Sequence, residues 1–418
     1  IKGYVPSQIS SIILSKLKNY SSGVKKAVVT VPAMFHEAAR AATLDAAKLA
    51  RLDVELINEP TAAVLHYANL PSSSVNGRVL VFDLGGGTFD ISIANVKGKK
   101  VDVITSVGNK NLGGRRFDEE IINIIDKKYK KAKGKGLENP LKDESLFVIA
   151  ERIKKILSNK DKVSEIIEGP KGPHKIDVSR KEFEDSIDTY IETIKMLMEE
   201  ALERADCKPN NISQTLLVGG STRMPIVSQT ITKIMKKAPV KGVNVDEAVA
   251  CGAAIYAGLQ NKDGLNTAQK KAISNVELND ICSSYFGTLM FTHDRERNVG
   301  GTVNDCVIPR DTKLPCSVTK NYQVMFDGQK EIDCTVTQSE GEESDVEFVI
   351  VIAKEPLKLS KNAKAGDPIE VTYSYDTNGM MHCVFQDMKS KKKHEINLKP
   401  EGTKDFKELK DSLDFEIE

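Results

Sequence analysis

One stretch decides the fold: Val79-Leu80-Val81-Phe82-Asp83-Leu84-Gly85-Gly86-Gly87-Thr88-Phe89-Asp90-Ile91-Ser92-Ile93. Two runs rich in β-branched and aromatic residues flank three consecutive glycines, and each run carries an aspartate beside the turn. An ordinary tight turn needs one or two glycines, because only one or two of its positions require positive φ. The sequence therefore predicts a hairpin whose loop serves a ligand.

The ligand predicted for this loop is a phosphate. Without Cβ atoms at Gly85, Gly86 and Gly87, backbone N–H groups can converge on an anion, and Thr88 adds a hydroxyl donor. A carboxylate beside a phosphate is repulsive unless a divalent cation lies between them, so Asp83 and Asp90 predict Mg²⁺ as well as a nucleotide. The alternative is a glycine-rich bend in an antiparallel sheet that binds nothing.

Composition excludes several classes of protein. The 418 residues predict two or more domains. The chain has 28% charged and 40% hydrophobic residues, an ordinary composition, and its net charge of +1 gives no overall attraction to nucleic acid or to an anionic membrane surface. Seven widely spaced cysteines without a CxxC pair predict free thiols in a reducing compartment, the cytoplasm, rather than disulfides or a zinc site. The basic run from Lys127 to Lys135 is interpreted as a solvated loop.

The first part of the chain alternates helices with strands. Apolar spacing predicts helices over residues 6–18 and 36–49, and β-rich runs predict strands over 26–32 and 54–57. This alternation is typical of an α/β sheet.

The second of these strands leads into Asn58-Glu59-Pro60-Thr61-Ala62-Ala63. Pro60 suits a first helical turn, so Glu59 lies at a strand-to-helix junction, where ligand-facing groups concentrate in open sheets. Beside a phosphate loop, its carboxylate could orient or deprotonate an attacking water. The alternative is that Glu59 only complements the helix dipole.

Two later helices carry polar candidates. Residues 111–118 hold a second glycine pair, which opens a helix to about residue 130. A helix over residues 145–159 places Glu151, Lys154 and Ser158 on one stripe, opposite its apolar face. The stripe is interpreted as a hydrogen-bonding edge for a purine, or as a solvated i,i+3 salt bridge.

The same layout of strand, glycine pair and helix recurs further along. A capping box at Ser179 and Glu182 predicts one long helix to Arg204. A strand over residues 215–218 then meets Gly219-Gly220-Ser221-Thr222-Arg223-Met224-Pro225, where the arginine can stack on a base or pair with a phosphate. Asp246 is expected to begin a helix rich in small residues, which permits very close packing.

Beyond residue 260 the apolar residues no longer follow a helical spacing. Residues 273–280 are interpreted as a linker, and short strand-like runs follow at 321–326, 331–336, 346–352 and 369–375. Turns at Asp327-Gly328 and Asn378-Gly379 complete the pattern of an antiparallel β-sandwich. The predicted domains are residues 1–260 for nucleotide binding, 261–280 as linker, 281–400 as the sandwich and 401–418 as a charged tail.

Four motifs together resemble the DnaK-type, seventy-kilodalton heat-shock chaperone family. They are Asp83–Asp90, Ile57–Ala63, Val218–Pro225 and Asp246–Ala254. The resemblance implies an α/β actin-like ATPase domain, here partial, followed by an all-β sandwich that binds extended apolar segments of unfolded proteins. ATP or ADP with Mg²⁺ would drive the cycle during protein folding and the stress response, and a J-domain cochaperone and a nucleotide exchange factor are the implied partners.

The resemblance also implies roles for individual residues. Glu59, Asp83 and Thr88 would be catalytic, and Asp83 and Asp90 would lie near Mg²⁺. Pro32 and Arg40 resemble a pair that relays nucleotide state to the peptide domain. The nucleotide would contact Gly85, Gly86, Gly87, Thr88, Gly114, Glu151, Lys154, Ser158, Gly219, Gly220, Ser221, Arg223 and Asp246.

The sequence also departs from the family pattern. The family has a first phosphate loop and a phosphate-binding lysine near its N-terminus, and both are expected upstream of Ile1. Ile1 corresponds to a position roughly one hundred residues into such a domain, so half of the ATP site is expected to be missing. The linker carries Glu277 within its apolar run. The helical lid that follows the sandwich in the family is expected to be absent, which predicts fast peptide exchange. The alternatives are a degenerate chaperone that binds without cycling, and a small-molecule kinase on the same scaffold.

Overall fold

The computed structural model describes residues 4–21, 23–70, 76–240, 244–294, 299–376 and 380–398. Its contacts divide the chain into two units. The first unit comprises Ile1–Val31, Phe35–Ile57 and Asn279–Glu418, and the second comprises Pro32–Met34 and Asn58–Leu278. The domain boundaries expected from composition stay a prediction.

The second unit is built on a five-stranded sheet. Its strand order is β8 (Ile212–Val218), β3 (Asn76–Leu84), β4 (Phe89–Lys97), β5 (Lys100–Asn109) and β9 (Glu277–Asn279). Strands β3 and β4 form the predicted hairpin, with Asp83 directly opposite Asp90, and β8 runs parallel to β3. The strand interiors from Val79 to Phe82 are buried, which explains their continuous apolar run.

Small residues let two helices of this unit approach closely. Helix α3 (Glu59–Ala68) packs on α9 (Ala248–Gln260), and a Cβ added at Gly252 would lie 1.8 Å from the carbonyl oxygen of Ala62. The predicted close packing is confirmed. Helix α9 begins at Ala248, two residues beyond the start expected at Asp246.

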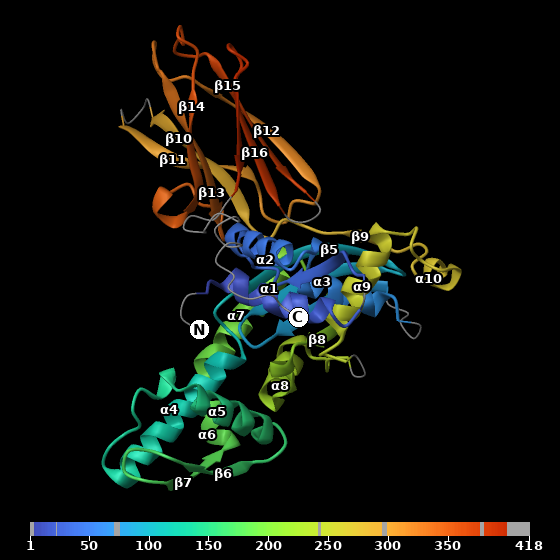
Figure 1. Ribbon diagram of the computed structural model, residues 1–418, viewed down its shortest axis with the longest axis vertical. Helices are drawn as coiled ribbons and strands as arrows, with labels where there is room; N and C mark the ends of the chain where they lie inside the picture. The colour runs from blue at the N-terminus through green and yellow to red at the C-terminus, as the bar shows by residue number, and fades with distance from the viewer. Residues whose placement is uncertain are drawn as a thin grey trace. The chain divides into compact units, whose positions relative to one another are not determined.

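Helices α4 (Gly114–Lys133) and α5 (Glu144–Leu157) pack together, and they are accompanied by η1 (Pro140–Lys142), α6 (Arg180–Ser186) and the hairpin of β6 (Lys162–Ile167) and β7 (His174–Ser179) (Figure 1). The solvated loop expected over Lys127 to Lys135 is wrong. Residues 127–133 form the end of α4, and Gly134 caps the helix with φ +77°.

The long helix expected from residue 179 to Arg204 is divided in two. Ser179 caps α6 by accepting from the Glu182 N–H, but the Glu182 carboxylate pairs with Lys128 at 2.6 Å rather than completing a capping box. The chain leaves helical geometry at the buried Ile187 and continues as α7 (Asp188–Arg204). After η2 (Pro209–Asn211) and β8, a turn η3 (Gly220–Arg223) precedes α8 (Pro225–Met235), as the glycine pair and Pro225 predicted.

The segment interpreted as a linker has regular structure. Helix α10 (Thr267–Ala272) precedes β9, whose Glu277 N–H donates to the carbonyl of Lys99. The Glu277 carboxylate pairs with Lys100 at 2.7 Å. The charge that interrupts the apolar run therefore has a partner on the neighbouring strand.

The first unit contains a small α/β portion and two larger sheets. Helices α1 (Pro6–Lys18) and α2 (Glu37–Leu49) pack together, and strands β1 (Lys26–Val31) and β2 (Asp53–Asn58) pair, so all four predicted elements are confirmed. The larger sheets have the orders β11-β10-β13-β14 and β12-β15-β16-β17 and share one hydrophobic core. Their bounds are Tyr285–Asp294 (β10), Val299–Ile308 (β11), Cys316–Gln323 (β12), Glu331–Ser339 (β13), Ile350–Lys358 (β14), Pro368–Tyr375 (β15), Met381–Asp387 (β16) and Lys393–Asn397 (β17).

Both sheets are antiparallel, as predicted for a sandwich. Two predicted strands are displaced, since β12 ends at Gln323 and residues 346–348 form a short helix, η4 (Val346–Phe348). The turn at Asp327-Gly328 carries the positive φ of +77° that favours glycine, whereas Asn378-Gly379 lies outside the described residues. Over the described ranges, no helix combines the length and apolarity needed to cross a bilayer.

Candidate functional site

The second unit contains a cavity of about 1170 Å³ at the ends of several elements. Residues of the glycine loop, α4, α5, η3 and the segment before α9 meet there, although they are far apart in the sequence. Eight of the residues that the family resemblance assigned to the nucleotide line it, together with Gly86 of the glycine loop: Gly114, Glu151, Lys154, Ser158, Gly220, Ser221, Arg223 and Asp246.

The glycine loop, residues 85–88, is fixed by neighbouring backbone. The Gly85 N–H donates to the Thr88 carbonyl at 3.1 Å, and the Gly85 carbonyl accepts from the Gly114 N–H and the Ser221 hydroxyl, both at 2.9 Å. A Cβ at Gly113 would lie 2.6 Å from the Gly87 nitrogen, so glycine is required for this approach. Nothing lies within 4 Å of a Cβ built on Gly86 or Gly87, and Gly86 lines the cavity.

Gly219 joins β8 to η3 without lining the cavity. Its φ of +83° belongs to the left-handed region, and a Cβ there would lie 2.4 Å from the Leu84 carbonyl oxygen. The residue therefore permits the close packing that places Gly220 and Ser221 beside the glycine loop.

Three carboxylates, Glu59, Asp83 and Asp90, form an acid cluster beside the hairpin turn. Burial raises the pKa of Asp83 well above its usual range, and the negative charges of Glu59 and Asp90 raise it further. Burial also raises the pKa of Glu59 to about 6. The Asp90 carboxylate accepts from the Met34 N–H at 3.1 Å. Like charges have thus been brought together in a poorly hydrated place.

The acid cluster fits a divalent cation held partly by water or phosphate. The Oδ2 atom of Asp83 is buried without a hydrogen-bond partner, and the acids that raise its pKa are the kind of group that Mg²⁺ neutralises. Within the described ranges, no three His, Cys, Asp or Glu side chains are placed to enclose a metal by themselves. Mg²⁺ commonly uses one or two carboxylates together with waters and substrate phosphates, so an all-protein cage is not required.

The acid cluster does not line the cavity; one side of the cavity is the α5 face, formed by Glu151, Lys154, Lys155 and Ser158. The Lys154 ammonium pairs with Asp118 at 2.8 Å and donates to the Gly114 carbonyl at 3.0 Å. The Ser158 hydroxyl donates to the Lys154 carbonyl at 3.1 Å. Both side chains of the Lys154–Asp118 pair are about nine-tenths buried, with 10% and 11% exposed, so the lysine is held in one position.

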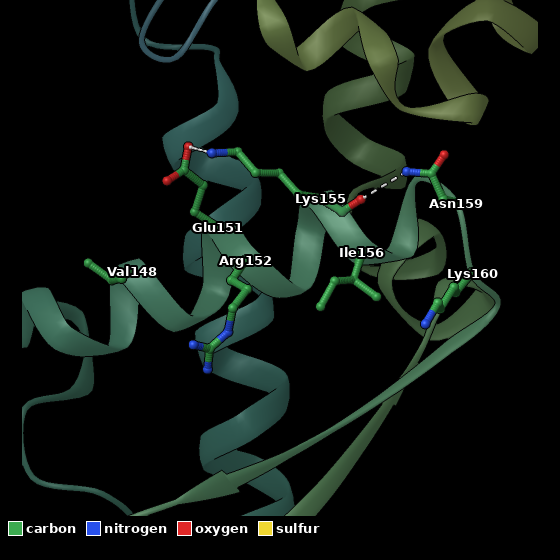
Figure 2. Close-up of a pocket in the computed structure, with 7 residues that line it drawn as sticks. All are labelled: Val148, Glu151, Arg152, Lys155, Ile156, Asn159 and Lys160. Atoms are coloured by element: carbon green, nitrogen blue, oxygen red, sulfur yellow. Dashed lines mark hydrogen bonds and ion pairs between the residues drawn. The ribbon is translucent and has the colours of Figure 1, made fainter.

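Two further ion pairs border the cavity. Lys155 folds back onto Glu151 at 2.9 Å, as Figure 2 shows from the outer side of α5, and this hydrogen bond lowers the pKa of Glu151. Arg223 pairs with Asp246 at 2.6 Å. The polar stripe predicted on α5 therefore faces the cavity. Of its alternative, the i,i+3 salt bridge, a different version is present: Glu151 makes an exposed i,i+4 pair with Lys155, while Lys154 pairs with Asp118.

Comparison with known families gives the site a context. The family model described as Hsp70 protein matches residues 1–414. The chain belongs to the Hsp70 family. Hsp70 membership supports a chaperone role, protein folding and ATP binding in general terms, because members of the family are ATPases. The mixed α/β content and several sheets of this Hsp70 chain agree with an ATPase followed by a β domain.

A smaller hollow of about 500 Å³ adjoins the cavity of this Hsp70 chain along the outer side of α5. Figure 2 shows Val148, Glu151, Lys155 and Asn159 along one edge of it. All four residues also line the larger cavity, so the hollow is an outward extension of the same region.

Several cavity residues of this Hsp70 chain were not predicted. They are Arg115, Asp118, Glu144, Phe147, Val148, Lys155, Asn159 and Met224. Asp118 could have been predicted from the sequence, because it follows the second glycine pair by one helical turn and shares a helix with Gly114. Lys155 and Asn159 extend the predicted stripe by one position each. No local sequence pattern indicates Arg115 or Phe147, because their contact joins two helices.

The relay residues expected from the resemblance lie in different units of this Hsp70 chain. Pro32 belongs to the second unit and Arg40 to the first, where Arg40 is buried in α2 and its Nε donates to the Phe35 carbonyl at 3.3 Å. One turn earlier on α2, the buried Glu37 accepts from the Tyr375 hydroxyl at 2.9 Å. The relay role stays a prediction.

Proposed function

We propose that this Hsp70-family chain is an ATP-dependent molecular chaperone that binds extended apolar segments of unfolded proteins. The observation that carries the proposal is the convergence of Gly86, the α5 face, η3 and Asp246 on one cavity. A cavity lined by polar side chains and bordered by a glycine loop suits adenosine on one side and phosphates on the other. The two four-stranded sheets that share a core are the proposed peptide-binding domain.

In this proposal different residues bind the nucleoside, the phosphates and the metal, and another accepts the proton. Lys154, Ser158 and Glu151 hydrogen-bond the nucleoside, and Arg223 contacts its base. Gly85 to Thr88 form the loop around the phosphates, and its free backbone N–H groups hold them; the Gly85 N–H is not one of these, because it donates to the Thr88 carbonyl. Asp83 and Asp90 would hold Mg²⁺, which when bound would neutralise phosphate charge. Glu59, whose pKa of about 6 lies near neutrality, accepts a proton from the attacking water.

The test compares Glu59→Gln with the unmodified chain in single-turnover ATP hydrolysis. The amide keeps the size and polarity of the side chain but cannot accept the proton. Hydrolysis is expected to slow by about 100-fold or more, while ATP affinity changes little. An unchanged single-turnover rate would remove Glu59 from the mechanism.

The chaperone part of the proposal needs a separate measurement. The release rate of a fluorescent apolar peptide is measured with and without Mg·ATP, and acceleration by ATP is expected. Peptide binding without any effect of ATP would favour a non-cycling binding module. Transfer of the γ-phosphate to a small molecule would instead support a kinase. J-domain and exchange-factor partners, and a cytoplasmic location, belong to the same proposal.

A further inference from the structure

Four cationic side chains line the cavity in the part of the chain that the structure describes: Arg115, Lys154, Lys155 and Arg223. They differ in how closely a carboxylate neutralises them. Lys154, Lys155 and Arg223 each lie 2.6–2.9 Å from an acid that also borders the cavity. The acid nearest to Arg115 is Glu144, at 3.6 Å, and the Glu144 side chain is 79% exposed. Arg115 is therefore the lining cation whose charge is least neutralised.

The Arg115 guanidinium is nevertheless well positioned. Its central carbon lies 4.0 Å from the centroid of the Phe147 ring, and Phe147 is a buried residue of α5. The backbone N–H of Arg115 donates to the Gly86 carbonyl at 2.8 Å, which ties the residue to the glycine loop. A planar guanidinium stacked on a ring keeps its in-plane donors available for a bidentate contact with an anion.

The first N–H groups of α4 do not provide this anion site. The Gly114 and Arg115 N–H groups already donate to the carbonyls of Gly85 and Gly86, and the Arg116 N–H donates to the Gly113 carbonyl. An anion near the start of α4 must therefore be bound by a side chain, and of the two arginines in this turn Arg115 is the one that lines the cavity.

We infer that Arg115, supported by Phe147, binds a phosphate group carried by the nucleotide in this cavity. The inference rests on the proposed function, because it assumes a nucleotide, and it adds a specificity-determining residue to that site. The phosphate has two possible sources: the 5′ chain, which the glycine loop would share, or a phosphate on the ribose. A ligand without phosphate would gain nothing from Arg115.

The experiment measures affinities of the full chain for adenosine, ADP and adenosine 3′,5′-bisphosphate by calorimetry, for the unmodified protein and Arg115→Gln. Loss of a charge-assisted contact is expected to weaken phosphorylated ligands by roughly 10- to 100-fold and to leave adenosine unchanged. A loss for both ADP and the bisphosphate identifies the 5′ phosphates. A loss for the bisphosphate alone identifies the ribose side.

Arg116→Gln is the matched control. Arg116 is the next residue on α4, carries the same charge and does not line the cavity, since its guanidinium pairs with Glu119 at 2.8 Å. It reports the change due to net charge alone. Glu144→Gln removes the competing acid and is expected to tighten phosphorylated ligands slightly, a result that a purely structural role for Arg115 does not give.

Two results overturn the inference. One is an equal loss for adenosine and the phosphorylated ligands, which would assign Arg115 to the base or to local folding. The other is an Arg115→Gln effect no larger than that of Arg116→Gln. Failure of the proposed function is distinct from both, because the unmodified protein would then bind none of the three ligands.

Discussion

The acid cluster and the α5 face differ in how their charges are balanced. In the acid cluster, Glu59, Asp83 and Asp90 are close enough for two of them to raise the pKa of the third, and one oxygen of Asp83 is buried without a partner. On the α5 face, Lys154 and Lys155 each have a carboxylate within 2.9 Å. In the first region carboxylates face one another, whereas on the α5 face each of these two lysines faces a carboxylate.

The largest effect is expected on the α5 face, from Lys154→Ala. The substitution leaves Asp118 buried without its counter-ion, and removing one partner of a buried pair costs about 3–5 kcal/mol of stability. The measurement is the free energy of unfolding in denaturant at pH 7.

Lys155→Ala on the same helix is the control. Its pair with Glu151 is mostly exposed, with 70% and 51% of the side chains accessible, so a cost below about 1 kcal/mol is expected. Equal costs for the two variants would mean that the Lys154–Asp118 pair is as hydrated as the Lys155–Glu151 pair. Lys154 would then not be the buried lysine, held in one position by Asp118, that the α5 face was described as containing.

A smaller effect is expected from the acid cluster as the pH changes. Because burial raises the pKa of Glu59 from 4.5 to about 6, the folded state holds more protons than the unfolded state between these values. Stability therefore falls as the pH rises through this window, by about 2 kcal/mol from Glu59.

The measurement is unfolding in denaturant at several pH values, with Glu59→Gln as the reference that cannot titrate. Asp83, with its raised pKa, extends the fall to higher pH. Added Mg²⁺ and nucleotide should reduce the slope, because a bound cation favours the ionised acids. A slope identical in the two proteins would show that Glu59 is hydrated and titrates normally.

Local rules predicted the parts of the site that one element supplies. The glycine loop and the facing pair Asp83 and Asp90 follow from a strand period of two on each side of a turn. The stripe of Glu151, Lys154 and Ser158 follows from the helical period. The motifs of η3 and of the start of α3 carry their own glycine and proline signals.

Contacts between elements were not predictable in this way. Lys154 meets Asp118, and Arg115 stacks on Phe147, across more than thirty residues of sequence, and neither pair has a spacing that indicates it. The break at Ile187 has neither glycine nor proline to indicate it, and the Ile187 side chain is buried in the core. The acid cluster lies between these cases, since each acid had a local signal but the mutual shift of their pKa values depends on tertiary packing.

The smallest effect concerns the cation that the acid cluster is expected to bind. Asp83→Asn keeps the shape of the side chain but removes the charge and the unpartnered oxygen. In the unmodified protein Mg²⁺ should tighten ADP binding by about tenfold, equivalent to about 1.4 kcal/mol, and the variant should lose this gain. Calorimetry with Mg²⁺ and with EDTA measures it, and Asp185→Asn on the exposed surface of α6 is the control. If Asp83→Asn keeps the full response to Mg²⁺, Asp83 does not hold the cation, and the proposed role of Glu59 in proton transfer would have to stand without a metal at Asp83.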